Sequence, residues 1–222
     1  MKILIACEES QAVCKEMRKL GHKAFSCDLE PCSGGHPEWH IQGDALKEAY
    51  SGRYDMMIAH PPCTFLSVSG ARWMYHNDDK RLPYAERRPH PNHPNRRHQQ
   101  EEGLEFVQKL MDAPIEKIAI ENPVSVISTR IGKPDQIIEP FQFGDPHNKK
   151  TCLWLKNLPL LVPTDIVEPE YVIGKDGKKY SMIHYMSKGH SKEHRQKMRS
   201  KTFPGIAKAF AKQWGGKITI DS

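Results

Sequence analysis

Short apolar runs of strand length alternate along the chain with segments that carry apolar residues at helical spacing. Five runs are typical of buried strands: 2–9, 22–30, 54–62, 116–124 and 151–155. Three segments have helical spacing: 10–21, 43–50 and 99–113, with Ser10 and Asp44 as expected caps of the first two and Gly21 as a stop. This alternation predicts an α/β fold, a mostly parallel, doubly wound, Rossmann-like sheet covered by helices on both faces.

Chemically distinctive residues follow several predicted strands at their carboxyl ends. Glu8 and Asp28 stand at two such ends, the sequence PPC (61–63) at a third and ENP (121–123) at a fourth. Doubly wound sheets bind their ligands beyond the carboxyl ends of the strands. We therefore expect these residues to gather along one edge of the sheet and to form the functional site.

Cys63 is the candidate nucleophile. Pro61 and Pro62 fix the backbone and lack N–H donors, so they end the strand at a defined point and hold the thiol there. A free cysteine is more often a structural residue than a reactive one. Glu121 changes that balance, because we expect a partly buried carboxyl group at the end of the apolar strand IAIE to have a raised pKa and to act as an acid beside the thiol.

Acidic residues mark a candidate cofactor site on the same edge. Glu8 and Asp28 are 20 residues apart, about the interval at which doubly wound folds hold a ribose. The loop after the first strand contains no glycine, and Glu8 and Glu9 would repel a pyrophosphate, so a dinucleotide does not fit. The sulfonium and amino groups of S-adenosyl-L-methionine suit an acidic edge, and this molecule is the predicted cofactor.

With these residues in place, the sequence resembles the DNA (cytosine-5) methyltransferase family, and its short phage-type members in particular. HPPCTFLS (60–67) looks like the Pro-Cys nucleophile loop of the family, and ENPV (121–124) looks like its Glu-Asn-Val motif. GD (43–44) looks like the aspartate that reads adenine, and HNKKTCLWL (147–155) resembles the Gln-x-Arg-x-Arg strand. SKTFPGIA (200–207) stands where the late cofactor motif belongs.

The resemblance implies S-adenosylmethionine-dependent C5-methylation of cytosine in double-stranded DNA, with the target base flipped out of the helix. It implies Cys63 as the nucleophile that adds to C6 and Glu121 as its acid partner at N3. The residues implied to bind the cofactor are Glu8, Glu9, Ser10, Asp28, Leu29, Asp44 and Pro61. Those implied to bind the substrate are Ser67, Arg72, Asn122, Lys149 and Lys150.

The chain departs from the pattern of this family at several positions. The first loop lacks the glycines of Phe-x-Gly-x-Gly, and the departing residues are Thr64 for Gln, Pro123 for Val, and Lys149 and Lys150 for arginines. Residues 1–222 are expected to form a single catalytic domain, in which 156–200 is a reduced target-recognition region and 200–216 returns to the core. A recognition region this short leaves room for a protein partner that supplies specificity.

The charge distribution favours a polyanionic partner. The chain has a net charge of +6 and a pI of about 8.9. Between His147 and Lys217, 13 Lys and 2 Arg stand against 5 acidic residues, so this part carries +10 and the remainder −4. A basic C-terminal third suits binding to backbone phosphates, and a solvated lysine-rich surface is the competing explanation.

Composition and cysteine usage narrow the class of protein. No apolar run reaches the ~20 residues of a membrane span. The six cysteines form no CxxC pair, which favours reduced thiols and a cytoplasmic location, in a bacterium or a phage-infected host. Trp154 and Trp214 are expected in the core.

The stretch 72–98 is rich in Pro, His and Arg and has little periodicity. His90, His93 and His98 lie among prolines without a cysteine, a spacing that does not favour zinc, and no metal is expected. We expect instead an irregular loop over the site. Its arginines are expected to meet phosphate: Arg87, Arg88, Arg96 and Arg97.

Two alternatives stay open on the sequence alone. The same chemistry could act on RNA or on a free pyrimidine nucleotide, because the recognition region is short. The chain could also be a non-catalytic DNA-binding relative, because the missing glycines would permit a loss of cofactor binding.

Overall fold

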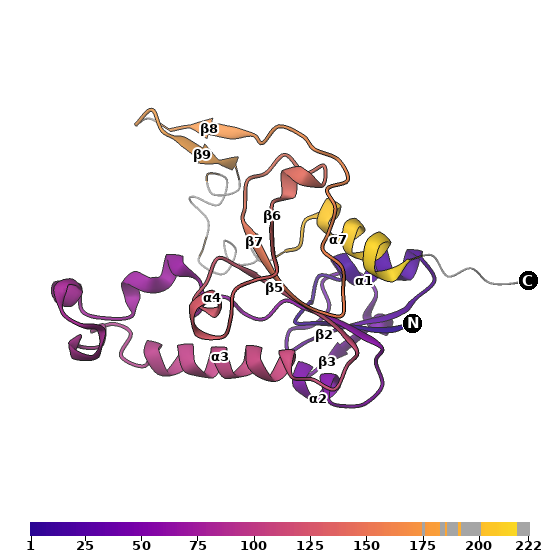
Figure 1. The fold of residues 1–222 in the computed structure, drawn as a ribbon, viewed down its shortest axis with the longest axis horizontal. Helices are drawn as coiled ribbons and strands as arrows, with labels where there is room; N and C mark the ends of the chain where they lie inside the picture. The colour runs from indigo at the N-terminus through magenta and orange to yellow at the C-terminus, as the bar shows by residue number, and fades with distance from the viewer. Residues whose placement is uncertain (175, 183–184, 186–190, 192–200, 217–222) are drawn as a thin grey trace, which may run out of the picture.

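The computed structural model describes residues 1–174, 176–182, 185, 191 and 201–216. Its main sheet has the strand order β3-β2-β1-β4-β5-β7-β6 (Figure 1). The strands are β1 (Lys2–Ala6), β2 (Lys23–Asp28), β3 (His40–Gln42), β4 (Met56–Ala59), β5 (Lys117–Pro123), β6 (Gln136–Ile138) and β7 (Thr151–Lys156). β1 to β5 are parallel, and β7 runs antiparallel to both β5 and β6. The predicted mostly parallel, doubly wound sheet is confirmed.

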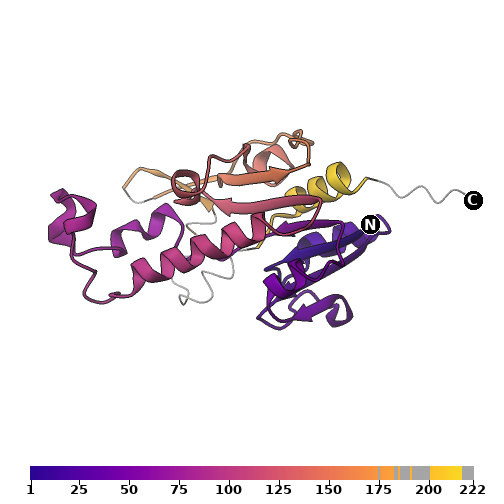
Figure 2. The ribbon, with the colours of Figure 1, turned by 60° about the horizontal axis from the view of Figure 1, so that its bottom comes forward.

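Helices cover both faces of the sheet. They are α1 (Ala12–Lys19), α2 (Ala45–Ala49), α3 (Arg96–Met111), α4 (Ile127–Arg130) and α7 (Pro204–Phe210), which continues into a π-helical turn (Ala211–Gly215). Alternate residues of β1 serve the two layers: Ile3 packs in the cluster with α1 and α7, and Leu4 in the cluster with α2 and α3. Figure 2 shows α3 along one side of the sheet and α7 on the other.

The start of α1 differs from the expectation. Gln11, in the left-handed conformation with φ 57°, precedes the first turn and makes no side-chain cap, so the prediction of Ser10 as the cap is wrong. The buried carboxylate of Glu8 takes that place. It accepts from the backbone N–H of Val13 at 2.7 Å and of Cys14 at 3.3 Å. An acid five residues before Val13 can do this because the backbone folds back at Gln11.

Two other helix signals are confirmed. Gly21, with φ 86°, follows the end of α1 in the conformation that glycine adopts without strain. Asp44 caps α2, because its carboxylate accepts from the backbone N–H of Leu46 at 2.9 Å.

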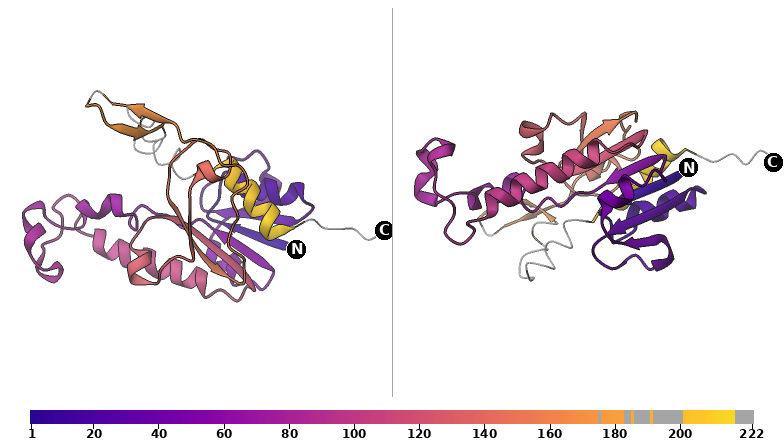
Figure 3. Two further views of the ribbon diagram at one scale, coloured as in Figure 1. Left: turned by 45° about the horizontal axis from the view of Figure 1, so that its top comes forward. Right: turned by 90° about the horizontal axis from the view of Figure 1, so that it is seen from below.

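Residues 68–95 form an irregular extension that we call the 68–95 lobe. It contains only short 3₁₀ turns: Val68–Trp73, Asn77–Arg81 and Tyr84–Glu86. Figure 3 shows it beyond the amino end of α3, at one side of the carboxyl edge of the sheet. The predicted lack of regular structure in 72–98 is confirmed apart from its last residues, which begin α3.

The arginines of this stretch hold the lobe together. Nη2 of Arg96 donates to the Thr64 carbonyl at 2.8 Å, and Nη2 of Arg97 donates to the Arg87 carbonyl at 2.7 Å. Arg87 itself donates to the Lys80 carbonyl at 2.9 Å. Arg88 pairs with the buried Asp79 at 2.7 Å. These guanidinium groups thus have an internal role, and their contact with phosphate stays a prediction.

A separate two-stranded antiparallel sheet is formed by β8 (Tyr171–Ile173) and β9 (Lys179–Ser181). It projects past the same edge of the sheet as the 68–95 lobe, on the opposite side (Figures 1 and 3). Much of the predicted target-recognition region, 156–200, lies outside the described residues. In the described part of the chain, no helix is long and apolar enough to span a membrane.

The C-terminal segment returns to the core. Phe210 is fully buried and stacks on Trp214 with ring centroids 4.5 Å apart. Trp214 and Trp154 are 5% and 7% exposed, which confirms their expected place in the core.

Replacement of Phe210 by alanine is expected to lower the free energy of unfolding by about 3–5 kcal/mol, since it empties a packed site between α1 and the sheet. Urea unfolding followed by circular dichroism measures this loss. Lys208→Ala, on the exposed face of the same helix, is the matched control and should change stability by less than about 0.5 kcal/mol. Equal effects of the two substitutions would contradict a core role for α7.

Candidate active site

The carboxyl ends of β4 and β5 bring the two predicted catalytic residues to one place. The strands are parallel neighbours, and Ala59 pairs with Ile120 at their ends. The chain leaves β4 through His60 and two prolines to reach Cys63, while Glu121 is the next residue of β5. The register therefore sets the start of the Cys63 loop beside Glu121.

His60 and Glu121 form a buried pair. Nδ1 of His60 lies 3.0 Å from Oε2 of Glu121, and the side chains are 8% and 13% exposed. Burial alone would lower the pKa of His60, but the hydrogen bond and charge of Glu121, with the charge of Glu8, raise it. Burial alone would raise the pKa of Glu121, but the hydrogen bond and charge of His60, with the charge of Lys149, lower it below its ordinary value, so the expected raised pKa is wrong. We therefore describe the pair as imidazolium and carboxylate.

Sequence reasoning does not single out His60, although the motif HPPC contains it. The sequence does contain one usable signal for this contact. A histidine directly after one apolar strand stands opposite an acid that directly follows the apolar part of the next strand. Parallel pairing of those two strands is enough to bring the side chains together.

Asn122 ties the Cys63 loop to β5. Its side chain is 1% exposed, and Nδ2 donates to the carbonyl of Pro61 at 2.8 Å. Beyond Cys63 the backbone turns, with the N–H of Ser67 donating to the Cys63 carbonyl at 2.9 Å. Ser67 then forms a β-bridge with Ser125, just after β5. The loop is thus held to β5 and to the chain that follows it at both ends.

The thiol of Cys63 is partly exposed on this loop. Burial raises its pKa, the charge of Glu121 raises it further, and Lys149 opposes both. The resting side chain is therefore a neutral thiol at pH 7. A reaction that uses its sulfur needs a neighbouring group to take the proton.

Lys149 reaches the site because β7 is antiparallel. Thr151 at the start of β7 pairs with Pro123 at the end of β5, so the residues just before β7 lie at the carboxyl edge. Nζ of Lys149 lies 5.6 Å from the ring centroid of Phe203. A small pocket opens here, with walls that include Glu121, Lys149, Lys201, Thr202, Phe203 and Ile206.

The other predicted substrate residues are not in this pocket. Lys150 is exposed beside Lys149. Arg72 is exposed in the 68–95 lobe, with its guanidinium 4.7 Å from the ring of Trp73. Oγ of Ser67 lies 3.0 Å from Oγ of Ser69. Their contact with a substrate stays a prediction.

The carboxyl ends of β1, β2 and β3 form a second half of the edge. Cys7 follows β1, Asp28 ends β2 and Asp44 follows β3, and these strands are parallel neighbours. Burial raises the pKa of the Cys7 thiol, and the charges of neighbours that include both aspartates raise it further. Asp44 is exposed, and Leu29 beside Asp28 is 74% exposed. Two carboxylates next to an exposed apolar side chain suit ribose hydroxyls, an amino group and a flat base, so this half fits S-adenosylmethionine.

Glu8, Glu9 and Ser10 are engaged within the protein. Glu8 binds the first turn of α1, and burial raises its pKa. The carbonyl of Glu9 accepts from the N–H of Ser33 at 2.9 Å, and the two side chains are hydrogen-bonded as well. A Cβ on Gly34 would lie only 2.5 Å from the carbonyl oxygen of Ser10, so the segment after β2 crosses directly over this loop. Their contact with a cofactor also stays a prediction.

A glutamine shapes the glycine-free turn after β1. Cys7 and Gln11 both have positive φ, 59° and 57°, which is uncommon outside glycine. Gln11 is fully buried, and its amide exchanges two hydrogen bonds with the backbone of His36, Nε2 to O at 2.8 Å and N to Oε1 at 3.1 Å. These bonds compensate for the strain of the left-handed backbone.

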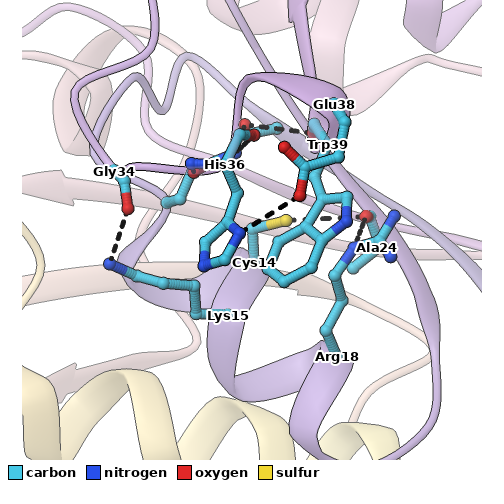
Figure 4. Close-up of polar contacts among 10 residues, drawn as sticks. Cys14, Lys15, Arg18, Ala24, Gly34, His36, Glu38 and Trp39 are labelled. Atoms are coloured by element: carbon cyan, nitrogen blue, oxygen red, sulfur yellow. Dashed lines mark hydrogen bonds and ion pairs between the residues drawn. The ribbon is translucent and has the colours of Figure 1, made fainter.

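The segment after β2 is also fixed against α1, as Figure 4 shows. Lys15 donates to the carbonyl of Gly34 at 3.2 Å, and the guanidinium of Arg18 lies 4.4 Å from the ring of Trp39. The ring of His36 stacks on Trp39 with centroids 3.7 Å apart. The segment after β2 is therefore held against both α1 and the turn after β1.

The histidines of the 68–95 lobe pack with an aromatic residue. His90 and His93 lie 5.1 and 5.4 Å from the ring of Trp73, and 5.2 Å from one another. Among the residues that the structure describes, no group of three or more His, Cys, Asp or Glu side chains is arranged to hold a metal ion.

No protein-family model matches the sequence, and no curated protein matches it. Among solved structures, the fold is similar to a protein from E. coli described as a DNA modification methyltransferase encoded within a prophage. The TM-score is 0.43 and the sequence identity 11%, over 76% of this chain. The chain spans about half, 52%, of that protein. At this distance the similarity assigns no activity, and function has to be argued from the residues themselves.

The His60–Glu121 pair predicts an acid limb of stability. Because the folded pKa of Glu121 is lowered, its contribution is present above the ordinary carboxyl pKa of about 4.3 and is lost as pH falls through the folded value. Glu121→Gln is expected to lose on the order of 3 kcal/mol at neutral pH and less on acidification. Unfolding in urea across the acidic range measures the difference from the wild type, and a constant difference would contradict the ion pair.

Proposed function

We propose that this protein transfers a methyl group from S-adenosyl-L-methionine to C5 of cytosine in DNA, through a covalent adduct between Cys63 and C6. The observation that carries the proposal is the joining of the Cys63 loop to the end of β5. The His60–Glu121 contact and the Asn122–Pro61 hydrogen bond hold a thiol and a carboxylate at the carboxyl ends of neighbouring strands.

The residue types suit the reaction. Cytosine C5 is a weak nucleophile until a group adds at C6, and the sulfur of Cys63 can make that bond. Glu121 faces a pocket beside Lys149, where a carboxyl group can hydrogen-bond N3 and the exocyclic amino group of the ring. Departure of the thiol after loss of the C5 proton restores the aromatic ring and the free enzyme.

The cofactor would be held by the second half of the edge. Asp28, Leu29 and Asp44 would hold the ribose and adenine, and Pro61 would border them on the β4 side. When bound, S-adenosylmethionine supplies an electrophilic methyl group. Glu8, Glu9 and Ser10 would act by shaping the turn beneath it, since the carboxylates of Glu8 and Glu9 are already bonded within the protein and the segment at Gly34 crosses over Ser10.

Duplex DNA with a flipped cytosine is the proposed substrate. The basic C-terminal third, from His147 to Lys217, has the charge that phosphate binding needs. A base must leave the helical stack before a thiol can reach C6. Residues 156–200 would recognise the target within a single catalytic domain, with a protein partner supplying further specificity. A cytoplasmic location is part of the same proposal.

Oligonucleotides that contain 5-fluorocytosine should trap the wild-type protein covalently in the presence of S-adenosylmethionine, because fluorine at C5 cannot leave as a proton. The expected product is a Cys63-linked adduct seen by denaturing electrophoresis and peptide mass spectrometry. Cys63→Ser should lose the adduct. Cys32→Ser, at a partly exposed thiol in the segment after β2, is the matched control and should keep it.

Parallel trapping on RNA and on the free nucleotide decides the substrate. Adducts formed with RNA or nucleotide and not with duplex DNA would make the substrate assignment wrong. Normal methylation of DNA by Cys63→Ala would remove the covalent mechanism.

Isothermal titration calorimetry should detect S-adenosylmethionine binding to the free protein. Asp28→Asn is expected to weaken the affinity by about tenfold or more, because a charged hydrogen-bond partner of the ligand is lost. Glu30→Gln, at an exposed acid two residues away, is the control and should bind as the wild type does. A wild type that does not bind at millimolar cofactor would support a non-catalytic DNA-binding protein instead.

A further inference from the structure

His60 is the one member of the buried pair to which the proposed reaction assigns no role. It lies three residues before Cys63, and its Nδ1 is 3.0 Å from Oε2 of Glu121. A carboxylate oxygen can only accept a hydrogen bond, so Nδ1 carries a proton and donates it to Glu121. Nε2 is buried, and among the described residues it has no hydrogen-bond partner. The imidazole is therefore directed to Glu121 alone.

The charged groups around the His60–Glu121 pair lie on or beside strands β1, β5 and β7. Glu8, after β1, and Glu121, on β5, are the acids that act on His60, and Lys149, before β7, is the cation. The thiols of Cys63 and of Cys152, on β7, also feel the charge of Glu121. Two acids against one cation favour the protonated form of His60.

The proposed addition needs Glu121 to be ionised. Burial by itself raises the pKa of this carboxyl group and so favours its protonated form. Glu121 could then not accept the proton that the neutral thiol of Cys63 must lose. The paired imidazolium removes this obstacle by stabilising the carboxylate.

The proton that Cys63 loses in the addition ends on N3 of cytosine, and Glu121 carries it. The S–H bond of Cys63 breaks and its proton goes to Glu121, while the sulfur electron pair forms the bond to C6. The C5–C6 double bond shifts to C4–C5, the C4–N3 double-bond pair moves to N3, and N3 takes the proton from Glu121. The thiol has then added across C6 and N3, and Glu121 is again a carboxylate.

We propose that His60 is a positioning residue for Glu121, which keeps that carboxyl group ionised and fixed so that it carries the Cys63 proton to N3 of cytosine. The proposal rests on the proposed function.

Release of tritium to water from DNA that contains 5-tritiated cytosine, without any methyl donor, reports addition at C6 followed by exchange at C5 and elimination, with no methyl-transfer step. In the wild type, the rate should fall on acidification only below the ordinary carboxyl range, as Glu121 gains a proton, because the contact with His60 lowers its pKa. In His60→Gln and His60→Ala, the midpoint of this fall should move up by about one pH unit or more, which is a tenfold loss on the acidic side. At alkaline pH the variants should approach the wild-type rate.

His22→Gln is the matched control. His22 is also buried, and its Nε2 is hydrogen-bonded to the carbonyl of Gly216. It makes no contact with Glu121, so replacement of His22 should leave the midpoint of the pH profile unchanged. Thermal melts of each variant verify folding, and His60→Gln keeps a polar side chain of similar reach. A uniform loss of rate at all pH values, with no shift of the midpoint, would overturn the proposal as a merely structural effect.

Carbon-13 NMR of the Glu121 carboxyl group, assigned with Glu121→Gln, separates this proposal from the proposed function. A lowered Glu121 pKa in the wild type that rises in His60→Gln supports the proposal, and an ordinary or unchanged value overturns it. If the pKa is lowered but the wild type releases no tritium from DNA, RNA or nucleotide, the proposed function fails. The proton-carrying role of His60 is then overturned with it, and the ion pair is structural.

Discussion

The parallel register of β4 and β5 is the constraint on which the rest of the site depends. It sets the residue after Ala59 beside the residue after Ile120, so that an imidazole and a carboxylate meet with little exposure to water. Neither charge could remain at that depth alone, since an unpaired buried ion costs several kcal/mol. The Cys63 loop and the end of β5 are therefore held together by electrostatics as well as by the Asn122 amide.

The direction of β7 in the sheet brings a third charged group, Lys149, to the site. Had β7 been parallel to β5, Lys149 would stand at the opposite edge of the sheet. Because it is antiparallel, its amino end meets the carboxyl end of β5, and a cation arrives where two acids are buried. A single reversed strand thus balances the charge of the site, and it also starts the basic part of the chain at the edge where a polyanion would bind.

Much of the core could be predicted from the sequence. The buried strands β1, β2, β4 and β5 have apolar runs, and Asp44 and Gly21 have local signals for a helix start and a helix end. β3 and β6 could not be predicted, because three residues carry no periodicity. Its position before the helix favours Ser10 as the cap of α1. In the structure the chain folds back at Gln11, and Glu8 reaches the first turn instead. The contact between His60 and Glu121 depends on the register of β4 against β5, and local sequence patterns do not specify that register.

The 68–95 lobe is joined to the Cys63 loop through α3. Arg96 and Gln100 in the first turns of this helix donate to the carbonyls of Thr64 and Phe65, and Gly103 leaves room for Leu66. The Cys63 loop can therefore open only if these bonds to the helix break in the same event. Loop and helix start should behave as one cooperative unit in hydrogen exchange, and the flexibility of the reactive thiol is governed from a helix that carries none of the proposed chemistry.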